Sequence, residues 1–244
     1  MNWFSAVKTT ETTEATAPVL LDFAGHSFEA LPSGALYWRA ASALLVADLH
    51  LEKLSSFAGR GSLLPPYDTV MTLKRLDADL ARSGAAEIIA LGDSFHRDAG
   101  VSTLLDADRL RLVGLLDRAR WTWISGNHDP APHALGGVCV TRLERLGVTL
   151  THEPKRGPEG LIAGHLHPAA HLRVNGRSVR RPCFVHDGKT MVLPAYGSAT
   201  GSLNILSAPF LGLFDWPALE VTMIGRGRVY PVSVRRLVAG YDGY

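Results

Sequence analysis

Short apolar runs alternate with stretches of helical periodicity along most of the chain. Five of the runs are predicted strands that end in polar residues, and they lie at 42–50, 87–95, 121–129, 148–154 and 161–168. Residues 66–83 carry apolar side chains at helical spacing, which predicts a helix that ends at Gly84. Residues 103–119 and 139–146 are also predicted to be helical. This alternation of strands and helices predicts a layered α/β fold.

The two ends of the chain differ from this central pattern. Residues 19–25 and 35–40 flank a Pro-Ser-Gly turn, which predicts a hairpin. Residues 171–240 are rich in β-branched residues, glycine and proline, and more strands are expected there. The Thr-, Ala- and Glu-rich start lacks apolar periodicity, so residues 1–17 are predicted to be a flexible lead-in. Residues 18–244 then form one domain, because a chain of 244 residues with 46% apolar content can build one large core.

Composition narrows the classes of protein that fit this pattern. The formal net charge of +2 neither demands nor excludes a nucleic-acid partner. The two cysteines, Cys139 and Cys183, form no CxxC pair, so neither a disulfide framework nor a thiolate zinc site is expected, and a reducing cytoplasm fits. The start of the chain is not patterned as a signal peptide. No apolar run approaches the roughly 18–20 residues of a membrane span, so no membrane association is expected.

Polar residues at the ends of the five predicted strands form the most informative pattern. The motifs are DLH (48–50), GD (92–93), GNHD (126–129), a lone His152 and GHLH (164–167). Open α/β sheets bind their ligands at the carboxyl ends of the strands. Residues i and i+2 of a strand point to the same side, so the two polar residues of DLH can share a centre, and so can the two histidines of GHLH.

These strand ends carry oxygen and nitrogen donors. The candidate metal ligands are Asp48, His50, Asp93, Asn127, His152, His165 and His167. Such donors suit Mn²⁺, Fe or Zn²⁺, and seven of them with one bridging carboxylate can hold two ions about 3.5–4 Å apart. The glycines before Asp93, Asn127 and His165 are expected to relieve sharp turns. Turn and capping chemistry is the simpler explanation for a single Asp or Asn, and a surface loop is one for His152, but the ordered set favours the ligand interpretation.

Taken in order, DLH, GDSFHR (92–97), GNHD, His152 and GHLH resemble the signature of the calcineurin-like metallophosphoesterases, over about 120 residues. The resemblance implies a four-layered αββα sandwich of two mixed β-sheets flanked by helices. The GDSFHR variant, the DLHLEK segment and the chain length are most similar to the bacterial ligase-associated DNA-damage-response members of that superfamily.

The same resemblance implies roles for the ligands. One ion would be held by Asp48, His50, Asp93 and His167. The other would be held by Asn127, His152, His165 and again Asp93, which would be the bridge. A metal-bridging hydroxide would be the nucleophile. His128 would not bind metal, and would instead act on the leaving-group oxygen as a general acid or stabilise charge on the phosphoryl group.

One position departs from the family pattern. Many members have GDxxDR, in which the second Asp pairs with the catalytic histidine, and here that position is His96. A neutral imidazole would fix the protonation state and tautomer of His128 less firmly than a carboxylate would. His96 is therefore either a catalytic neighbour of His128 or an ordinary loop histidine. Arg97 is a candidate phosphate ligand, because a guanidinium group matches phosphate in a bidentate fashion.

Four arginines follow the GHLH motif closely, and they are Arg173, Arg177, Arg180 and Arg181. Such a cluster is usually a solvated face, but it can also line a groove for a polynucleotide backbone. In the second case all four should lie on the same face of the protein as the metal centre. We expect no sequence-specific reading of bases, because the chain has no helix-turn-helix, zinc-finger or RNP-like pattern.

These observations predict a metal-dependent phosphodiesterase. The resemblance favours a DNA endonuclease that acts in repair with two Mn²⁺ ions, in functional association with a DNA ligase and helicase system. A phosphoesterase for a small nucleotide or cyclic nucleotide is the alternative within the same class. A non-catalytic scaffold of this fold is the alternative of another class, and missing ligands would mark it, but every ligand position is filled.

Overall fold

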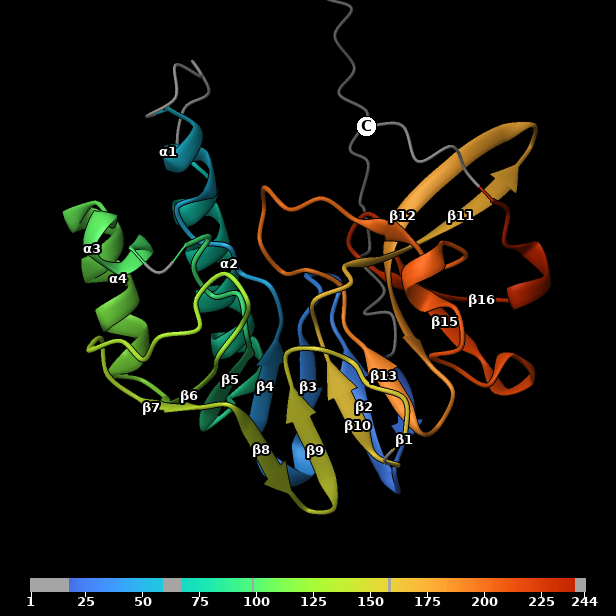
Figure 1. The fold of residues 1–244 in the computed structure, drawn as a ribbon, viewed down its shortest axis with the longest axis horizontal. Helices are drawn as coiled ribbons and strands as arrows, with labels where there is room; N and C mark the ends of the chain where they lie inside the picture. The colour runs from blue at the N-terminus through green and yellow to red at the C-terminus, as the bar shows by residue number, and fades with distance from the viewer. Residues whose placement is uncertain (1–17, 59–66, 98, 158, 240–244) are drawn as a thin grey trace, which may run out of the picture.

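The computed structural model describes residues 18–58, 67–97, 99–157 and 159–239. In this part of the chain two mixed β-sheets pack face to face, and α-helices cover the outer face of one of them (Figure 1). The fold class expected from the sequence is thereby confirmed. The predicted lead-in lies outside the described residues.

The first sheet is antiparallel in its first half and parallel in its second. Its strands in spatial order are β1 (Val19–Phe23), β2 (His26–Ala30), β3 (Leu36–Trp38), β4 (Ala43–Val46), β5 (Glu87–Leu91), β6 (Arg120–Ile124) and β7 (Val138–Val140). Strands β4 to β7 are parallel, with Leu45 opposite Ile89 across β4 and β5. Their carboxyl ends therefore lie along one edge of the sheet.

The second sheet has a parallel centre with antiparallel strands around it. It contains β8 (Arg142–Arg145), β9 (Val148–Thr151), β10 (Leu161–Ala163), β11 (Pro168–Val174), β12 (Arg177–His186), β13 (Thr190–Val192), β14 (Leu203–Asn204), β15 (Glu220–Ile224) and β16 (Val229–Val232). The order is β14-β11-β12-β13-β10-β9-β8, with β15 beside β12 and β16 beside β15. Strands β9, β10 and β13 are parallel, and the long strand β12 extends beyond them as a hairpin with β11.

The α-helices form the layer outside the first sheet. They are α1 (Lys53–Ala58), α2 (Asp68–Ser83), α3 (Gly100–Thr103) and α4 (Asp106–Leu116). Helix α2 buries Leu73, Leu76 and Leu80 against the sheet and ends at Gly84, which has a φ of 62°, as the apolar spacing predicts. The described part of the chain has no helix that combines the length and the apolar content needed to span a membrane.

Three apolar clusters hold the layers together. One lies between the helices and the first sheet, one between the two sheets, and one on the outer face of the second sheet. The last is covered by short 3₁₀ turns, including η2 (Ala208–Phe210) and η3 (Trp216–Ala218). Further 3₁₀ turns are η1 (Arg39–Ala41) and η4 (Val234–Arg236). The fourth layer is therefore made of 3₁₀ turns and loops in the described residues, and the α-helices lie on one side.

Two local predictions were wrong. The helix expected at 139–146 is instead the end of β7 followed by β8. Strand β7 pairs with β6 in the first sheet, and β8 pairs with β9 in the second. Leu146 and Gly147, with φ values of 50° and 78°, then close the β8–β9 hairpin as a two-residue turn. The Pro-Ser-Gly turn joins β2 to β3, and residues 19–23 form a separate strand that pairs with β2.

Tyr196, in the segment that follows β13, joins the helical layer to the strand ends. Its hydroxyl donates a hydrogen bond of 2.8 Å to the buried carboxylate of Asp79 in α2. The guanidinium group of Arg75 lies 4.4 Å above the Tyr196 ring. The backbone N–H of Tyr196 donates to the carbonyl of Ala47, directly after β4. The side chain and the backbone of one residue therefore link α2 to the segments after β4 and β13.

Tyr196→Phe should lower the free energy of unfolding by about 1–3 kcal/mol, because it removes one hydrogen-bond donor from the buried Asp79 carboxyl. The matched control is Tyr230→Phe, since the Tyr230 ring is 43% exposed. Urea unfolding followed by circular dichroism measures both changes. Equal stability of the two variants would contradict the role assigned to the Tyr196–Asp79 bond.

Candidate metal centre

The carboxyl ends of strands from both sheets meet at one edge of the sandwich (Figure 1). The first sheet contributes the residues after β4, β5 and β6, and the second contributes those after β9 and β10. All seven candidate ligands lie at this edge, and their donor atoms form two clusters.

The first cluster is built around His152. Its Nε2 atom lies 2.9 Å from Asn127 Oδ1, 3.1 Å from His165 Nδ1 and 3.4 Å from Asp93 Oδ1. The other ring nitrogen, Nδ1, donates to the carbonyl of Leu91 at 2.9 Å, which leaves Nε2 for a ligand. His152 is 4% exposed, so the structure places it in the site and not in a surface loop.

The second cluster is built around His167. Its Nε2 atom lies 3.4 Å from both His50 Nε2 and Asp48 Oδ1. Asp48 is fully buried, and its carboxylate accepts the backbone N–H of His165. That hydrogen bond joins the end of β4 to the end of β10, and so ties the two sheets together at the site.

Asp93 reaches both clusters with different oxygen atoms. Its Oδ1 atom faces His152, and its Oδ2 atom lies 3.7 Å from His50 Nε2. The backbone N–H of His128 donates to Oδ1 at 2.9 Å and holds the carboxylate in this orientation. A carboxylate with one oxygen on each side is the geometry of a bridging ligand.

The donor set fits divalent metal ions. Ligand atoms about 2.1 Å from one ion and at right angles to each other are about 3 Å apart, close to the spacings within each cluster. Asp48 and Asp93 are both buried, and among the described residues their ion pairs are all with histidines. Buried carboxylates of this kind need cations nearby, and oxygen and nitrogen donors suit hard or borderline metals.

The ligands also perturb one another's protonation. Burial opposes charge on Asp93, but the hydrogen bond and the charge of His152 outweigh it and lower the pKa of Asp93 to about 2. Burial likewise disfavours the charged form of His152, yet Asp93 and Asp48 raise its pKa to about 9. A metal ion that binds His152 near neutral pH must therefore displace a proton, so metal binding is coupled to proton release.

The backbone at the strand ends adopts a conformation that residues other than glycine rarely take. Five candidate ligands have φ values in the left-handed region, and they are Asp48 (54°), His50 (42°), Asp93 (49°), His165 (70°) and His167 (45°). Each such residue costs on the order of 1–3 kcal/mol and persists only where the surrounding structure holds it. Clusters of this strain are typical of functional sites.

Three glycines are required here mainly by lack of space. A Cβ atom at Gly126 would lie 2.1 Å from Asp93 Oδ1, and one at Gly164 would lie 2.7 Å from Asp48 Oδ2. At Gly92 it would lie 2.4 Å from His152 Nδ1, and this residue also has a φ of 82°. The expected relief of sharp turns therefore applies to Gly92, whereas Gly126 and Gly164 let the backbone approach a ligand side chain.

His128 is oriented by the backbone of His96. The Nδ1 atom of His128 bonds the His96 carbonyl at 3.0 Å, which leaves Nε2 4.0 Å from Asp93 Oδ2. The two imidazole rings stack with centroids 5.1 Å apart. Burial lowers the pKa of His96, and the charges of His128 and Lys53 add to this effect. The tautomer of His128 is thus set by a carbonyl group, and His96 is more than a distant loop residue.

The other predicted site residue of this segment, Arg97, is exposed directly after His96. Sequence reasoning gave no role to Asp129, the last residue of GNHD. Its buried carboxylate accepts the backbone N–H groups of Phe95 at 3.0 Å and Gly126 at 3.1 Å. It therefore fastens the GDSFHR segment to the GNHD segment, and the acid in the fourth position of GNHD was the available signal.

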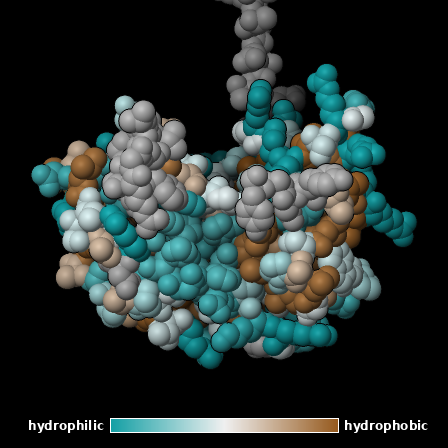
Figure 2. Space-filling model, turned by 45° about the horizontal axis from the view of Figure 1, so that its top comes forward, coloured by the Kyte–Doolittle hydropathy of each residue, from teal (hydrophilic) through white to brown (hydrophobic). Residues whose placement is uncertain are grey.

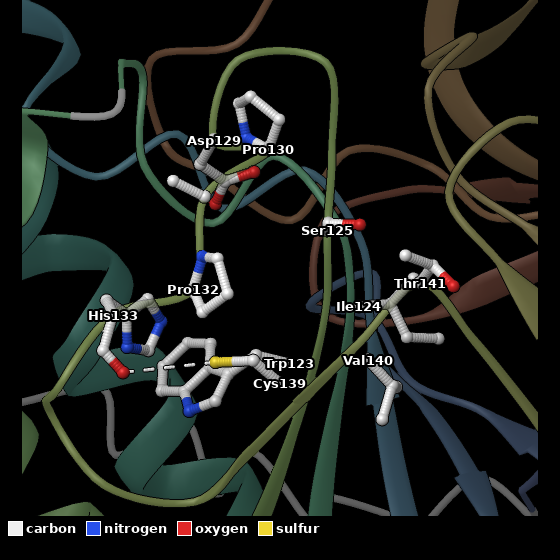
Figure 3. Close-up of a pocket in the computed structure, with 11 residues that line it drawn as sticks. Trp123, Ile124, Ser125, Asp129, Pro130, Pro132, His133, Cys139, Val140 and Thr141 are labelled. Atoms are coloured by element: carbon white, nitrogen blue, oxygen red, sulfur yellow. Dashed lines mark hydrogen bonds between the residues drawn. The ribbon is translucent and has the colours of Figure 1, made fainter.

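A cavity of about 190 Å³ lies behind the GNHD segment (Figure 3). Trp123, Pro130, Pro132 and the partly buried Cys139 line it, and the side chain of Asp129 borders it. None of the seven candidate ligands lines this cavity. It is therefore separate from the metal centre.

The four arginines do not share one face. In the β11–β12 hairpin, Arg180 stands opposite His171, and Arg173 stands opposite Ser178, so both arginines lie on the face that continues to Phe184 in the core between the sheets. Arg177 and Arg181 lie on the other face, which continues to the outer apolar cluster. The expectation of one common face was therefore wrong for two of the four arginines, because successive side chains of a strand point to opposite faces of the sheet.

Comparison with solved structures shows which known proteins the chain is similar to. The chain is similar to nuclease MPE of Pseudomonas putida, with a TM-score of 0.69 and 29% identity over 88% of this chain and 100% of that chain. The phosphoesterase Yfce of E. coli has a TM-score of 0.33 and 15% identity over 81% and 96% of the two chains. A predicted phosphoesterase of Streptococcus pneumoniae has a TM-score of 0.29 and 14% identity over 82% and 92%. No family model and no curated protein matches the chain.

Gly126→Ala should weaken metal binding by roughly 10–100-fold, the range typical of changes in the groups that orient a ligand. The added methyl group would push against the Asp93 carboxylate. Gly114→Ala in α4 is the control, since no atom lies within 4 Å of its Cβ position. Titration with Mn²⁺ in a calorimeter measures both. Wild-type affinity in the Gly126 variant would show that the carboxylate has room to move.

Proposed function

We propose that this chain, a calcineurin-like metallophosphoesterase and a phosphoric ester hydrolase, cleaves phosphodiesters with the help of two divalent metal ions. The observation that carries the proposal is the orientation of Asp93, whose two carboxylate oxygens face separate ligand clusters. One ion would be held by Asp48, His50, His167 and Asp93, and the other by Asn127, His152, His165 and Asp93. Mn²⁺ is the ion we favour, with Fe or Zn²⁺ as alternatives.

Bound in these clusters, two divalent ions supply an activated water molecule and neutralise charge on the phosphoryl oxygens. The protein positions the rest of the reaction. The left-handed strand ends and the Asp48–His165 hydrogen bond fix the ligand atoms before substrate arrives. Prepositioned groups of this kind avoid reorganisation when charge develops on the phosphoryl group.

His128 is suited to protonate the leaving-group oxygen. Its Nδ1–H donates to the His96 carbonyl, and Nε2 points toward the metal centre on a side chain that is 39% exposed. A substrate can therefore reach this nitrogen. Arg97, which is exposed directly after His96, is proposed to bind a phosphate oxygen.

DNA is the substrate we propose, in a repair setting and in association with a DNA ligase and helicase system. The similarity to a nuclease at 29% identity supports a nuclease activity. The inner face of the β11–β12 hairpin adds two arginines, Arg173 and Arg180, and Arg180 lines an open groove together with the candidate ligand His167. A small nucleotide remains the second candidate, because the overall charge is close to neutral.

His128→Ala should keep both metal ions and lower kcat by roughly 10²–10⁴-fold, the usual range for a positioned acid or base. The loss should be smaller for bis-p-nitrophenyl phosphate, because p-nitrophenolate leaves without a proton. Turnover on that ester and on DNA, with metal content measured in the same samples, gives the comparison. An equal loss on both substrates would exclude proton donation and favour charge stabilisation.

The two faces of the hairpin allow a matched test of DNA binding. The double variant Arg173→Ala and Arg180→Ala should lose affinity for DNA and show a weaker dependence of binding on salt, since each lost phosphate contact lowers the salt slope by about 0.9 for duplex DNA. The double variant Arg177→Ala and Arg181→Ala removes the same charge from the opposite face. If both double variants lose DNA binding equally, net charge is responsible and the inner-face groove is excluded.

A further inference from the structure

An open groove of about 870 Å³ leads away from the metal centre at His167. Lys53, at the start of α1, and Arg180, in β12, both line it, although these elements rise on opposite sides of the strand ends (Figure 1). The rest of its lining is short or apolar, and consists of Pro182, Gly201, Ser202, Leu203, Ser207, Ala208 and Pro209. Hydrophilic residues gather at the centre of this face of the molecule (Figure 2).

Lys53 is held at the groove by the residue before it. Glu52 is 2% exposed and has a left-handed φ of 65°, and its carboxylate accepts hydrogen bonds from Thr69 Oγ1 at 3.0 Å and Ser55 Oγ at 2.7 Å. Its backbone N–H also donates to Thr69 Oγ1 at 2.9 Å. These bonds anchor the DLHLEK segment to the first turn of α2. The strained and buried Glu52 thus fixes the backbone from which Lys53 reaches the groove.

The charge at this end of the groove is positive. Lys53 and the candidate ligand His167 line the same groove, so the ammonium group lies on the side of the metal centre. Arg180 is held on the other side by a hydrogen bond from its guanidinium group to the Ser202 carbonyl. Lys53 and Arg180 are the lysine and the arginine among the described residues that line the groove. Cationic side chains that line an open groove favour an anionic ligand.

We infer that Lys53 and Arg180 bind the phosphate that neighbours the scissile one on the same nucleic-acid strand. The inference rests on the proposed phosphodiesterase function and adds a second phosphate subsite to it. It makes the enzyme select a polynucleotide over a diester with a single phosphate. Lys53 acts as a point charge on a flexible stem, so it needs no fixed phosphate geometry and no particular base.

The test compares two substrates in each variant. Bis-p-nitrophenyl phosphate has one phosphate, and a single-stranded oligothymidylate has many. The ratio of kcat/KM on the oligonucleotide to kcat/KM on the small diester should fall about tenfold in Lys53→Ala, mainly through KM. The slope of log affinity against log salt should decrease by about 0.7, which corresponds to one lost contact with single-stranded DNA.

Two further variants control this test. Lys53→Arg keeps the charge and should keep most of the ratio, whereas Arg181→Ala removes a neighbouring charge on the far face of the hairpin and should leave the ratio and the slope unchanged. A parallel loss on both substrates in Lys53→Ala, or an unchanged ratio and slope, overturns the subsite. If the wild-type protein cleaves neither substrate with any divalent ion, the proposed function fails instead, and the two failures are distinct.

Discussion

The Asp93 carboxylate is the interaction on which the rest of the site depends. It is buried, it faces a ligand cluster with each of its oxygens, and a backbone N–H of the GNHD segment holds it in place. Asp48 and Asp93 together bring two negative charges out of water. Among the described residues, the ion-pair partners of Asp93 are all histidines. Such an arrangement is costly unless cations bind there. The arrangement of histidines and strand ends around the two carboxylates provides a place for such cations.

The backbone at the strand ends is strained, and contacts between the two sheets hold it in that conformation. Left-handed residues at the ends of β4, β5 and β10 turn their side chains inward, where a regular strand would continue outward. Hydrogen bonds between the sheets, such as His165 to Asp48, and between the Gly197 N–H and the Asp48 carbonyl, prevent relaxation. The same edge therefore combines five left-handed candidate ligands with two clusters of closely spaced polar groups.

Much of the metal centre could be predicted, because the ends of buried strands can be recognised in the amino-acid sequence. An apolar run followed by Asp, Asn or His identifies both the strand and the polar residue at its end, and the order of the motifs identifies the set. The division of the ligands into two clusters was implied only by the family resemblance, because the spacing of the motifs does not show that β9 and β10 belong to a different sheet from β4 to β6.

Pairing across strands decided the features that could not be predicted. Residues 139–146 have a composition compatible with a helix, but pairing with β6 and β9 outweighs this local preference. The division of Arg173 and Arg180 from Arg177 and Arg181 follows from the hairpin register. The acid in GNHD identifies Asp129 as a candidate, but its hydrogen bond to Phe95 depends on the distance between two loops and is not recorded in the spacing of the motifs.

Electron paramagnetic resonance of the Mn²⁺-loaded protein measures whether one carboxylate holds two metal ions together. Two Mn²⁺ ions about 3.5–4 Å apart and joined by Asp93 should give the broad, temperature-dependent spectrum of a coupled pair at a stoichiometry of two. A six-line spectrum of isolated Mn²⁺ at that stoichiometry, or saturation at one ion per chain, would contradict the account.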